Sequence, residues 1–236
     1  MGPGSPPEQV RGRPGSGPGG RPITYGPEQL RADLGVSQET AERLSTHLRL
    51  IQDWNDRAGL MGPREFPDYW RRHALDCAQL LDLAPKAKSW LDIGSGAGLP
   101  GIVIAIRLME QGSGHIDLVE RSAKKCDFLR AVIAELGLPA TVHEKQIAEL
   151  QGPKDGGARY DVVTARAVAP LKRLIDSARP WLTRGATGLF PKGADYASEL
   201  VAAGFPPVGG GFQGLTAEAL ASRSNPDARI IRIRAA

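Results

Sequence analysis

The fold of this chain is decided by the stretch SWLDIGSGAGLPGIVIAIRLME, residues 89–110. A short apolar run over 89–93 leads into alternating glycines, and an apolar pattern with helical spacing follows over 99–110. A strand that turns tightly into a helix opens a βαβ unit, and glycines in the turn let the backbone approach a ligand closely. The stretch therefore predicts a ligand-binding loop at the carboxyl edge of a parallel sheet.

The rest of the chain after this stretch alternates short apolar runs with helical patterns, which indicates further βαβ units. Strands are expected at 115–120, 141–145, 160–165, 187–193 and 228–235. Helices are expected at 122–136, 170–182 and 194–204. Because no internal repeat appears, residues 89–236 predict one doubly wound sheet with helices on both faces, an α/β fold of the Rossmann-like class.

The segment before the sheet is predicted to be helical. Ser37 is placed to cap a helix that runs towards Trp54, and a second helix is expected over 68–83. We therefore assign residues 28–88 to a helical N-terminal subregion of a single domain, 28–236.

Composition separates this domain from a tail, because more than half of the positions in 1–27 are Gly or Pro. Such a segment has too little apolar surface to offset its ordering entropy and is expected to be disordered. Over all 236 residues, 41% hydrophobic and 24% charged content excludes a collagenous, coiled-coil or wholly disordered protein. No secretory leader appears, and no apolar run reaches the roughly 20 residues of a membrane span, so a cytoplasmic protein without a membrane partner is expected.

The cysteine content and the net charge bear on whether the protein holds a metal and whether it binds nucleic acid. Cys77 and Cys126 lack the spacing of a metal or redox site, so they predict structural thiols and no bound metal. The formal net charge of +4 is compatible with a nucleic-acid partner without establishing one.

Two classes of ligand compete for the glycine loop. Gly96, Gly98 and Gly101 satisfy the dinucleotide pattern G-x-G-x-x-G, but Gly94 already ends the strand, so the register is late. Asp92 stands beside the loop, where its charge would oppose a pyrophosphate and attract the cationic methionine end of S-adenosylmethionine. We therefore favour adenosylmethionine and include Asp92 and the first three loop glycines in the predicted cofactor site.

Several further motifs carry a resemblance to a known family. They are Trp54-Asn55, Arg72-His73-Ala74-Leu75-Asp76, the extended loop 91–101, Lys124-Lys125-Cys126-Asp127-Phe128-Leu129-Arg130, Ala165-Arg166-Ala167 and Pro191-Lys192-Gly193. With these motifs the chain resembles the bacterial glucose-inhibited division protein B family, the guanine-N7 methyltransferases of 16S ribosomal RNA. The resemblance covers nearly everything except the tail.

The resemblance implies a class I methyltransferase fold whose last strand is antiparallel, and S-adenosylmethionine as the cofactor. It implies cofactor contacts at Gly94, Leu99, Glu120, the backbone of Ile147 and Ala148, and Arg166. Glu120 also ends the expected strand 115–120, where it is placed to accept hydrogen bonds from ribose hydroxyls in either ligand class.

The end of the expected strand 160–165 bears on the chemistry. Methyltransferases that act on exocyclic amines commonly carry an Asp/Asn-Pro-Pro-aromatic segment there, whereas this chain has Thr164-Ala165-Arg166-Ala167. Guanine N7 has a free lone pair and no proton to lose, so its methylation needs positioning rather than a general base. We predict Arg166 and Lys192 as catalytic residues: Arg166 would pair bidentately with a carboxylate or phosphate, and Lys192 would contact a phosphate or base.

Basic residues elsewhere are candidates for RNA contact. Arg72 and His73 precede the sheet, and Lys124, Lys125 and Arg130 lie on one expected helix; solvated helix faces are the competing interpretation. The expected partner is 16S rRNA or the small ribosomal subunit, and a monomer is compatible with the sequence. A small-molecule methyltransferase, a nicotinamide oxidoreductase and a non-catalytic RNA-binding module remain as alternatives.

Overall fold

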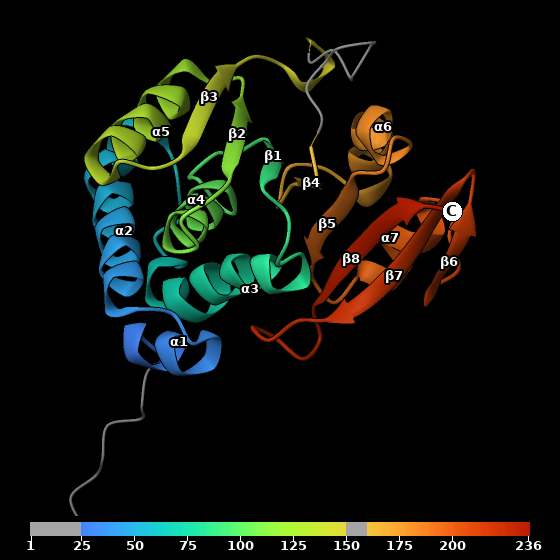
Figure 1. Cartoon of the computed structure of the whole chain (residues 1–236), viewed down its shortest axis with the longest axis horizontal. Helices are drawn as coiled ribbons and strands as arrows, with labels where there is room; N and C mark the ends of the chain where they lie inside the picture. The colour runs from blue at the N-terminus through green and yellow to red at the C-terminus, as the bar shows by residue number, and fades with distance from the viewer. Residues whose placement is uncertain (1–24, 150–159) are drawn as a thin grey trace, which may run out of the picture.

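The computed structural model of the chain describes residues 25–149 and 160–236 (Figure 1). Its centre is one eight-stranded sheet with the order β3-β2-β1-β4-β5-β8-β7-β6. The strands are β1 (Ser89–Ile93), β2 (His115–Glu120), β3 (Ala140–Glu144), β4 (Val162–Thr164), β5 (Thr187–Lys192), β6 (Gly209–Phe212), β7 (Leu215–Ala221) and β8 (Arg229–Ala235). The first five run parallel, which confirms the predicted Rossmann-like α/β fold.

The helices cover both faces of the sheet, as predicted (Figure 1). The α-helices are α1 (Pro27–Leu34), α2 (Gln38–Ala58), α3 (Asp76–Leu83), α4 (Gly101–Glu110), α5 (Ala123–Leu136), α6 (Leu171–Leu182) and α7 (Tyr196–Ala202). The shorter helical turns are η1 (Phe66–Asp68), η2 (Tyr69–Leu75) and η3 (Ile147–Glu149). The expected helix over 68–83 is thus helical throughout, but the π-helical turn η2 opens it before α3 begins.

The C-terminal part of the sheet differs from the sequence-based expectation of parallel strands. β8 pairs antiparallel with β5, as the resemblance implied, and β7 and β6 continue the sheet antiparallel beyond it. Neither β6 nor β7 was predicted. The sequence of β6 is GGGF and that of β7 is LTAEALA, both poor in the residues that favour strands, so the pairing of β7 with β8 and of β6 with β7 decides their conformation.

Alternation along the central strands divides the core between the two faces. Trp90 of β1 packs in a core that includes α3, α4 and α5, whereas its neighbour Leu91 packs with α6 and α7. Successive side chains of a strand point to opposite faces, so each parallel strand must be apolar on both. The packing of the two layers fixes the carboxyl edge of β1, β2, β4 and β5 as one common rim.

The folded part begins before the predicted boundary of the tail. Tyr25 packs against the core, its hydroxyl donates to Asp33 at 2.7 Å, and the guanidinium of Arg71 lies 5.9 Å from its ring centroid. Pro27 is the first residue of α1. Assigning the tail as far as Pro27 was therefore wrong at its end, and the rest of the predicted tail, 1–24, lies outside the described residues.

The state of the cysteines, metal ligation and membrane spans can each be examined in the described part of the chain. Cys77 in α3 and Cys126 in α5 are buried free thiols, as expected. Among residues 25–149 and 160–236, no cluster of three or more His, Cys, Asp or Glu side chains is placed to hold a metal. No helix in these ranges combines the length and apolarity that crossing a membrane requires.

One buried histidine joins the helical subregion to the sheet. His47 of α2 is fully buried, its Nε2 lies 2.9 Å from the carbonyl oxygen of Ala97, and its Nδ1 lies 3.1 Å from the hydroxyl of Tyr69. A carbonyl only accepts hydrogen bonds, so Nε2 must carry the proton and Nδ1 accepts from Tyr69. Burial lowers the pKa of His47 to about 4, against the opposing effect of its hydrogen bond to Ala97.

Replacement of His47 by Gln should reduce the pH dependence of stability. The unfolded histidine has a pKa of about 6.5, so between pH 6.5 and 4 the unfolded state binds more protons, and stability is lost as the pH falls. We expect the free energy of unfolding of the parent to decrease, between pH 7 and pH 5, by about 2 kcal/mol more than that of His47→Gln. Urea unfolding at both pH values measures this, and other titrating groups cancel in the difference. Equal pH dependence of the two proteins would contradict the prediction.

Candidate functional site

The glycine loop follows β1 and leads into α4, as predicted. Its backbone has positive φ at Gly94 (+72°) and Gly98 (+77°), a region that favours glycine. A Cβ at Gly98 would lie 2.3 Å from Cγ1 of Ile102, and one at Gly94 would lie 2.5 Å from Cγ2 of Val168. The loop therefore has no room for side chains at these two positions.

Asp92, near the end of β1, supports the glycine loop through a buried carboxylate. Its carboxylate is fully buried, and Oδ2 accepts a hydrogen bond from the backbone N–H of Gly101 at 3.1 Å. Oδ1 has no hydrogen-bond partner among the described residues. Burial raises the pKa of Asp92 to about 7, although hydrogen bonds from Ser95 and Gly101 oppose the shift. The side chain of Asp92 has no exposed surface, so its predicted effect on a cofactor would come from its charge and not from direct contact.

Glu120 holds the loop from the neighbouring strand. Its Oε2 accepts from the N–H of Gly96 at 3.0 Å, and its Oε1 accepts from the N–H groups of Arg121 and Ser122, each at 2.9 Å. A carboxylate has about four lone-pair sites, so acceptor capacity remains for a ribose hydroxyl. The predicted role of Glu120 toward the cofactor stays a prediction.

The remaining predicted cofactor residues lie along the same rim. Leu99 is half-buried against the core. Ile147 and Ala148 open η3 directly after β3, and the N–H of Lys145 donates to the carbonyl of Glu120 at 3.0 Å, which ties this segment to the end of β2. No contact among the described residues tests the predicted cofactor role of Leu99, Ile147 and Ala148, which stays a prediction.

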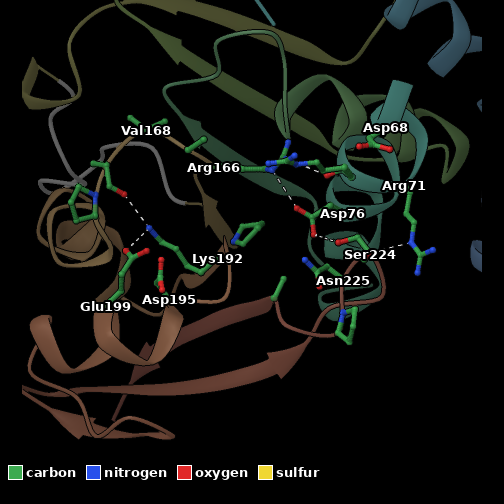
Figure 2. Close-up of a pocket in the computed structure, with 18 residues that line it drawn as sticks. Asp68, Arg71, Asp76, Arg166, Val168, Lys192, Asp195, Glu199, Ser224 and Asn225 are labelled. Atoms are coloured by element: carbon green, nitrogen blue, oxygen red, sulfur yellow. Dashed lines mark hydrogen bonds and ion pairs between the residues drawn. The ribbon is translucent and has the colours of Figure 1, made fainter. Parts of the chain in front are cut away.

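A cleft of about 1130 Å³ opens at the carboxyl edge of β4 and β5 (Figure 2). Its walls come from η2 and the start of α3, from residues 166–170, from the end of β5 with α7, and from the connection between β7 and β8. Arg166 and Lys192, the two predicted catalytic residues, both line it. The structure thus brings together the two side chains that the sequence singled out at separate strand ends.

Arg166 is held by the helical wall of this cleft. Nε lies 3.2 Å from Oδ2 of Asp76, and Nη2 lies 3.0 Å from the carbonyl oxygen of Arg72 and 2.8 Å from Nδ1 of His73. Figure 2 shows Arg166 and Asp76 pointing toward one another. The predicted bidentate pairing of Arg166 with a ligand anion needs correction for this arrangement, because Nε and Nη2 already bind the protein itself.

Lys192 is also paired within the protein. Its Nζ lies 2.7 Å from Oε2 of Glu199 and 3.0 Å from the carbonyl oxygen of Ala169, and only 9% of the side chain is exposed. The same Glu199 oxygen accepts from the N–H of Leu171 at the start of α6. The Lys192–Glu199 pair therefore anchors the 166–170 turn. The positive charge of Lys192, which was expected to contact a phosphate or base, is already compensated by Glu199.

The residues predicted to contact RNA separate into three groups. Arg72 has an exposed side chain that lines the cleft. His73 is 4% exposed and Arg166 donates to it; burial first and the Arg166 charge second lower its pKa to about 4. The expectation that His73 contacts RNA is therefore corrected: it is a neutral, buried acceptor.

The third group lies on α5, away from the cleft. Lys124 is exposed and Lys125 half-buried, while Arg130 pairs with Asp127 at 3.1 Å and with Glu144 at 3.0 Å. This geometry fits the solvated helix face that the sequence left open, and it does not test contact with RNA.

Three residues of the site were not predicted as functional from the sequence. Asp76 was quoted only as part of a motif, although a carboxylate among the apolar residues of a helix signals a buried partner. Glu199 gave no signal, because its partners Lys192 and Leu171 meet it only through folding. Val168 is 47% exposed, follows Ala167 with a positive φ of 55°, and both contacts the position of Gly94 and lines the cleft.

Comparison with known proteins identifies the family of this chain. The family model for GidB, rRNA small subunit methyltransferase G, matches residues 40–219. Two curated relatives named ribosomal RNA small subunit methyltransferase G, from Methylorubrum populi and Methylobacterium radiotolerans, are 40% and 42% identical to this chain. The matches cover 87% and 89% of this chain and 93% and 95% of the relatives.

A solved structure agrees with the fold alone. The O-methyltransferase TomG from Streptomyces achromogenes, solved in complex with SAM, is similar with a TM-score of 0.57 at 15% identity, over 90% of this chain and 97% of that one. The sheet, the glycine loop and the two sequence comparisons lead to one assignment: the chain belongs to the GidB family of rRNA small subunit methyltransferase G.

Proposed function

We propose that this protein uses S-adenosylmethionine to methylate N7 of one guanine in a loop of 16S ribosomal RNA. The observation that carries the proposal is the position of Val168, which packs over Gly94 of the glycine loop and also lines the cleft. A cofactor on the loop and a base in the cleft would therefore adjoin at a single residue. Family membership supports rRNA as the substrate over the small-molecule, oxidoreductase and non-catalytic alternatives.

The described loop fits adenosylmethionine better than a dinucleotide. Bound adenosylmethionine supplies a methyl group on a cationic sulfonium. The unpartnered Oδ1 of Asp92 places uncompensated negative charge beneath the loop when the carboxyl is ionised, which favours a cation there and opposes a pyrophosphate. Gly94, Leu99, Glu120, Ile147 and Ala148 would hold the cofactor along the rim.

The cleft suits a reaction that needs no general base. Guanine N7 offers a lone pair and loses no proton, so the protein has to position the base and tolerate the positive charge that methylation creates there. The two half-buried cations of the cleft, Arg166 and Lys192, are paired with Asp76 and Glu199, and the carboxylate of Asp195 lines the same space. These acidic groups would stabilise the charge on the methylated base.

A loop of RNA is the expected context of the guanine. The deep major groove of an A-form helix would bury N7, whereas an unpaired base is free to enter a pocket. The exposed Arg72 and its neighbour Arg71 line the cleft, where they would contact phosphates. We infer that 16S rRNA, free or within the small ribosomal subunit, is the partner, and that the protein acts in the cytoplasm.

Replacing Gly94 by Val should abolish cofactor binding. The new side chain would overlap Val168 and strain a positive φ, so we expect the Kd for adenosylmethionine to rise at least about 100-fold, or roughly 2.7 kcal/mol. Isothermal calorimetry measures this. Gly137→Ala is the control, because Gly137 also has a positive φ (+62°, against +72° at Gly94) but a Cβ there meets nothing within 4 Å, and this variant should keep the parent Kd. Unchanged affinity of Gly94→Val would contradict the assignment of the loop.

Deletion of the gene should remove one N7-methylguanosine from 16S rRNA. Mass spectrometry of nuclease digests from the deletion strain, and from strains complemented with the parent or with Arg166→Ala, tests this. We expect the parent to restore the methylated base, and Arg166→Ala to restore much less of it at equal protein level, because Arg166 lines the cleft. An unchanged rRNA profile in the deletion strain would refute the proposed substrate.

A further inference from the structure

We propose that Asp76 is a positioning residue for methyl transfer, which acts by holding the guanidinium of Arg166 in a preformed socket. The Arg166 socket consists of the Arg72 carbonyl, the His73 imidazole and the Asp76 carboxylate. The inference rests on the proposed function, since it concerns the cleft in which the base would be methylated.

The socket lies at the C-terminal end of the π-helical turn η2, where the backbone bonding departs from the α-helical pattern. In η2, the N–H of Asp76 donates to the carbonyl of His73. It therefore does not donate to the Arg72 carbonyl, its partner in a regular α-helix. The Arg72 carbonyl instead accepts from Nη2 of Arg166 at 3.0 Å. Single π-helical turns often occur at functional sites. Here the bond from Asp76 to the carbonyl three residues earlier leaves the Arg72 carbonyl to accept from Arg166.

Asp76 is itself held on its other side. Oδ1 accepts from the hydroxyl of Ser224 at 2.7 Å, from that of Ser222 at 3.1 Å and from the amide of Gln79 at 3.2 Å, while Oδ2 faces Arg166. The side chain is 11% exposed, so the carboxylate is a buried charge with its acceptor sites used. Such a group has little freedom to rotate, which fixes the direction of the bond to Arg166.

The geometry leaves only one nitrogen of Arg166 for a ligand. A guanidinium has five N–H donors, and the socket engages the one on Nε and the two on Nη2. The recorded contact of Nη1 is the sulfur of Cys77 at 3.9 Å. Asp76 therefore determines where Nη1 points, and a donor that is oriented before the substrate arrives loses no entropy when it binds.

The socket also joins segments that are distant in the sequence. Arg166 follows β4, Asp76 begins α3, and Ser224 lies in the connection from β7 to β8. Nε of Arg71 donates to the carbonyl of Ser224 at 3.1 Å, which adds a second tie between η2 and that connection. All three segments line the cleft (Figure 2), so displacement of Asp76 would alter its wall at Arg166.

A double-mutant cycle on activity separates positioning from mere support of the fold. Asp76→Asn keeps the shape of the side chain but loses the charge that pairs with Arg166. We measure kcat and KM for methyl transfer to 16S rRNA from a deletion strain, with Asp76→Asn, Arg166→Gln and the double variant. We expect Asp76→Asn to lower kcat at least about tenfold in the parent background and less than about twofold in the Arg166→Gln background.

Two further variants keep the result interpretable. Ser224→Ala removes the shortest bond to Asp76, and its kcat should fall about threefold in the parent and not at all with Arg166→Gln. This variant provides the cycle if Asp76→Asn does not fold. Asp82→Asn is the matched control on the same helix, because Asp82 pairs with Arg107 and Arg223 outside the cleft, and it should retain parent kcat.

A measurement without substrate distinguishes failure of this inference from failure of the proposed function. In the parent, the Nε–H of Arg166 should give a slowly exchanging proton NMR signal, and Asp76→Asn should lose it while the amide spectrum stays folded. Equal loss of kcat in both backgrounds, parent kcat in Asp76→Asn, or an unchanged Arg166 signal would overturn the positioning role. A parent enzyme that binds adenosylmethionine but does not methylate 16S rRNA would instead refute the proposed substrate.

Discussion

The backbone of the glycine loop is held at three points, and the rest of the site depends on this constraint. The carboxylates of Asp92 and Glu120 accept from N–H groups of Gly101 and Gly96, and His47 donates to the carbonyl of Ala97. These groups come from β1, from β2 and from α2. The helical subregion is therefore part of the loop's support, because its buried imidazole satisfies a carbonyl that would otherwise lose its hydrogen bond on burial.

The cleft beside this loop contains ion pairs between side chains of the protein itself. Arg166 is paired with Asp76, and Lys192 with Glu199, so both half-buried cations are neutralised by carboxylates from other elements. A buried charge is tolerated only when its partner and hydrogen bonds are in place. The cations Arg166 and Lys192 therefore do not form an open anion-binding site in the cleft. This agrees with a neutral base as the occupant of the cleft and with chemistry that needs no proton acceptor.

Local patterns carried most of the information needed for the parallel half of the fold. The runs that form β1, β2 and β5, and the glycines between β1 and α4, are apolar and periodic enough to be recognised one at a time. The same reasoning failed for β6 and β7, whose residues have low strand propensity and whose conformation depends on the pairing of β7 with β8 and of β6 with β7. Sequence patterns also placed Arg166 and Lys192 correctly at the carboxyl edge of the sheet, because parallel strands end together. They did not reveal that both side chains bind carboxylates of the protein itself.

By itself, the sequence determined the Rossmann-like sheet, the position of its ligand loop and the family, because strand periodicity, glycines and motifs are properties of short stretches. Only the tertiary structure decided what each charged side chain does. The partners of Arg166 lie about ninety residues earlier in the chain: Arg72 and His73 on a π-helical turn without a sequence signal, and Asp76 at the start of α3. Burial and pairing arise from contacts between distant segments, so His73 becomes a buried neutral acceptor, and Asp76 the partner of Arg166, only once the chain has folded.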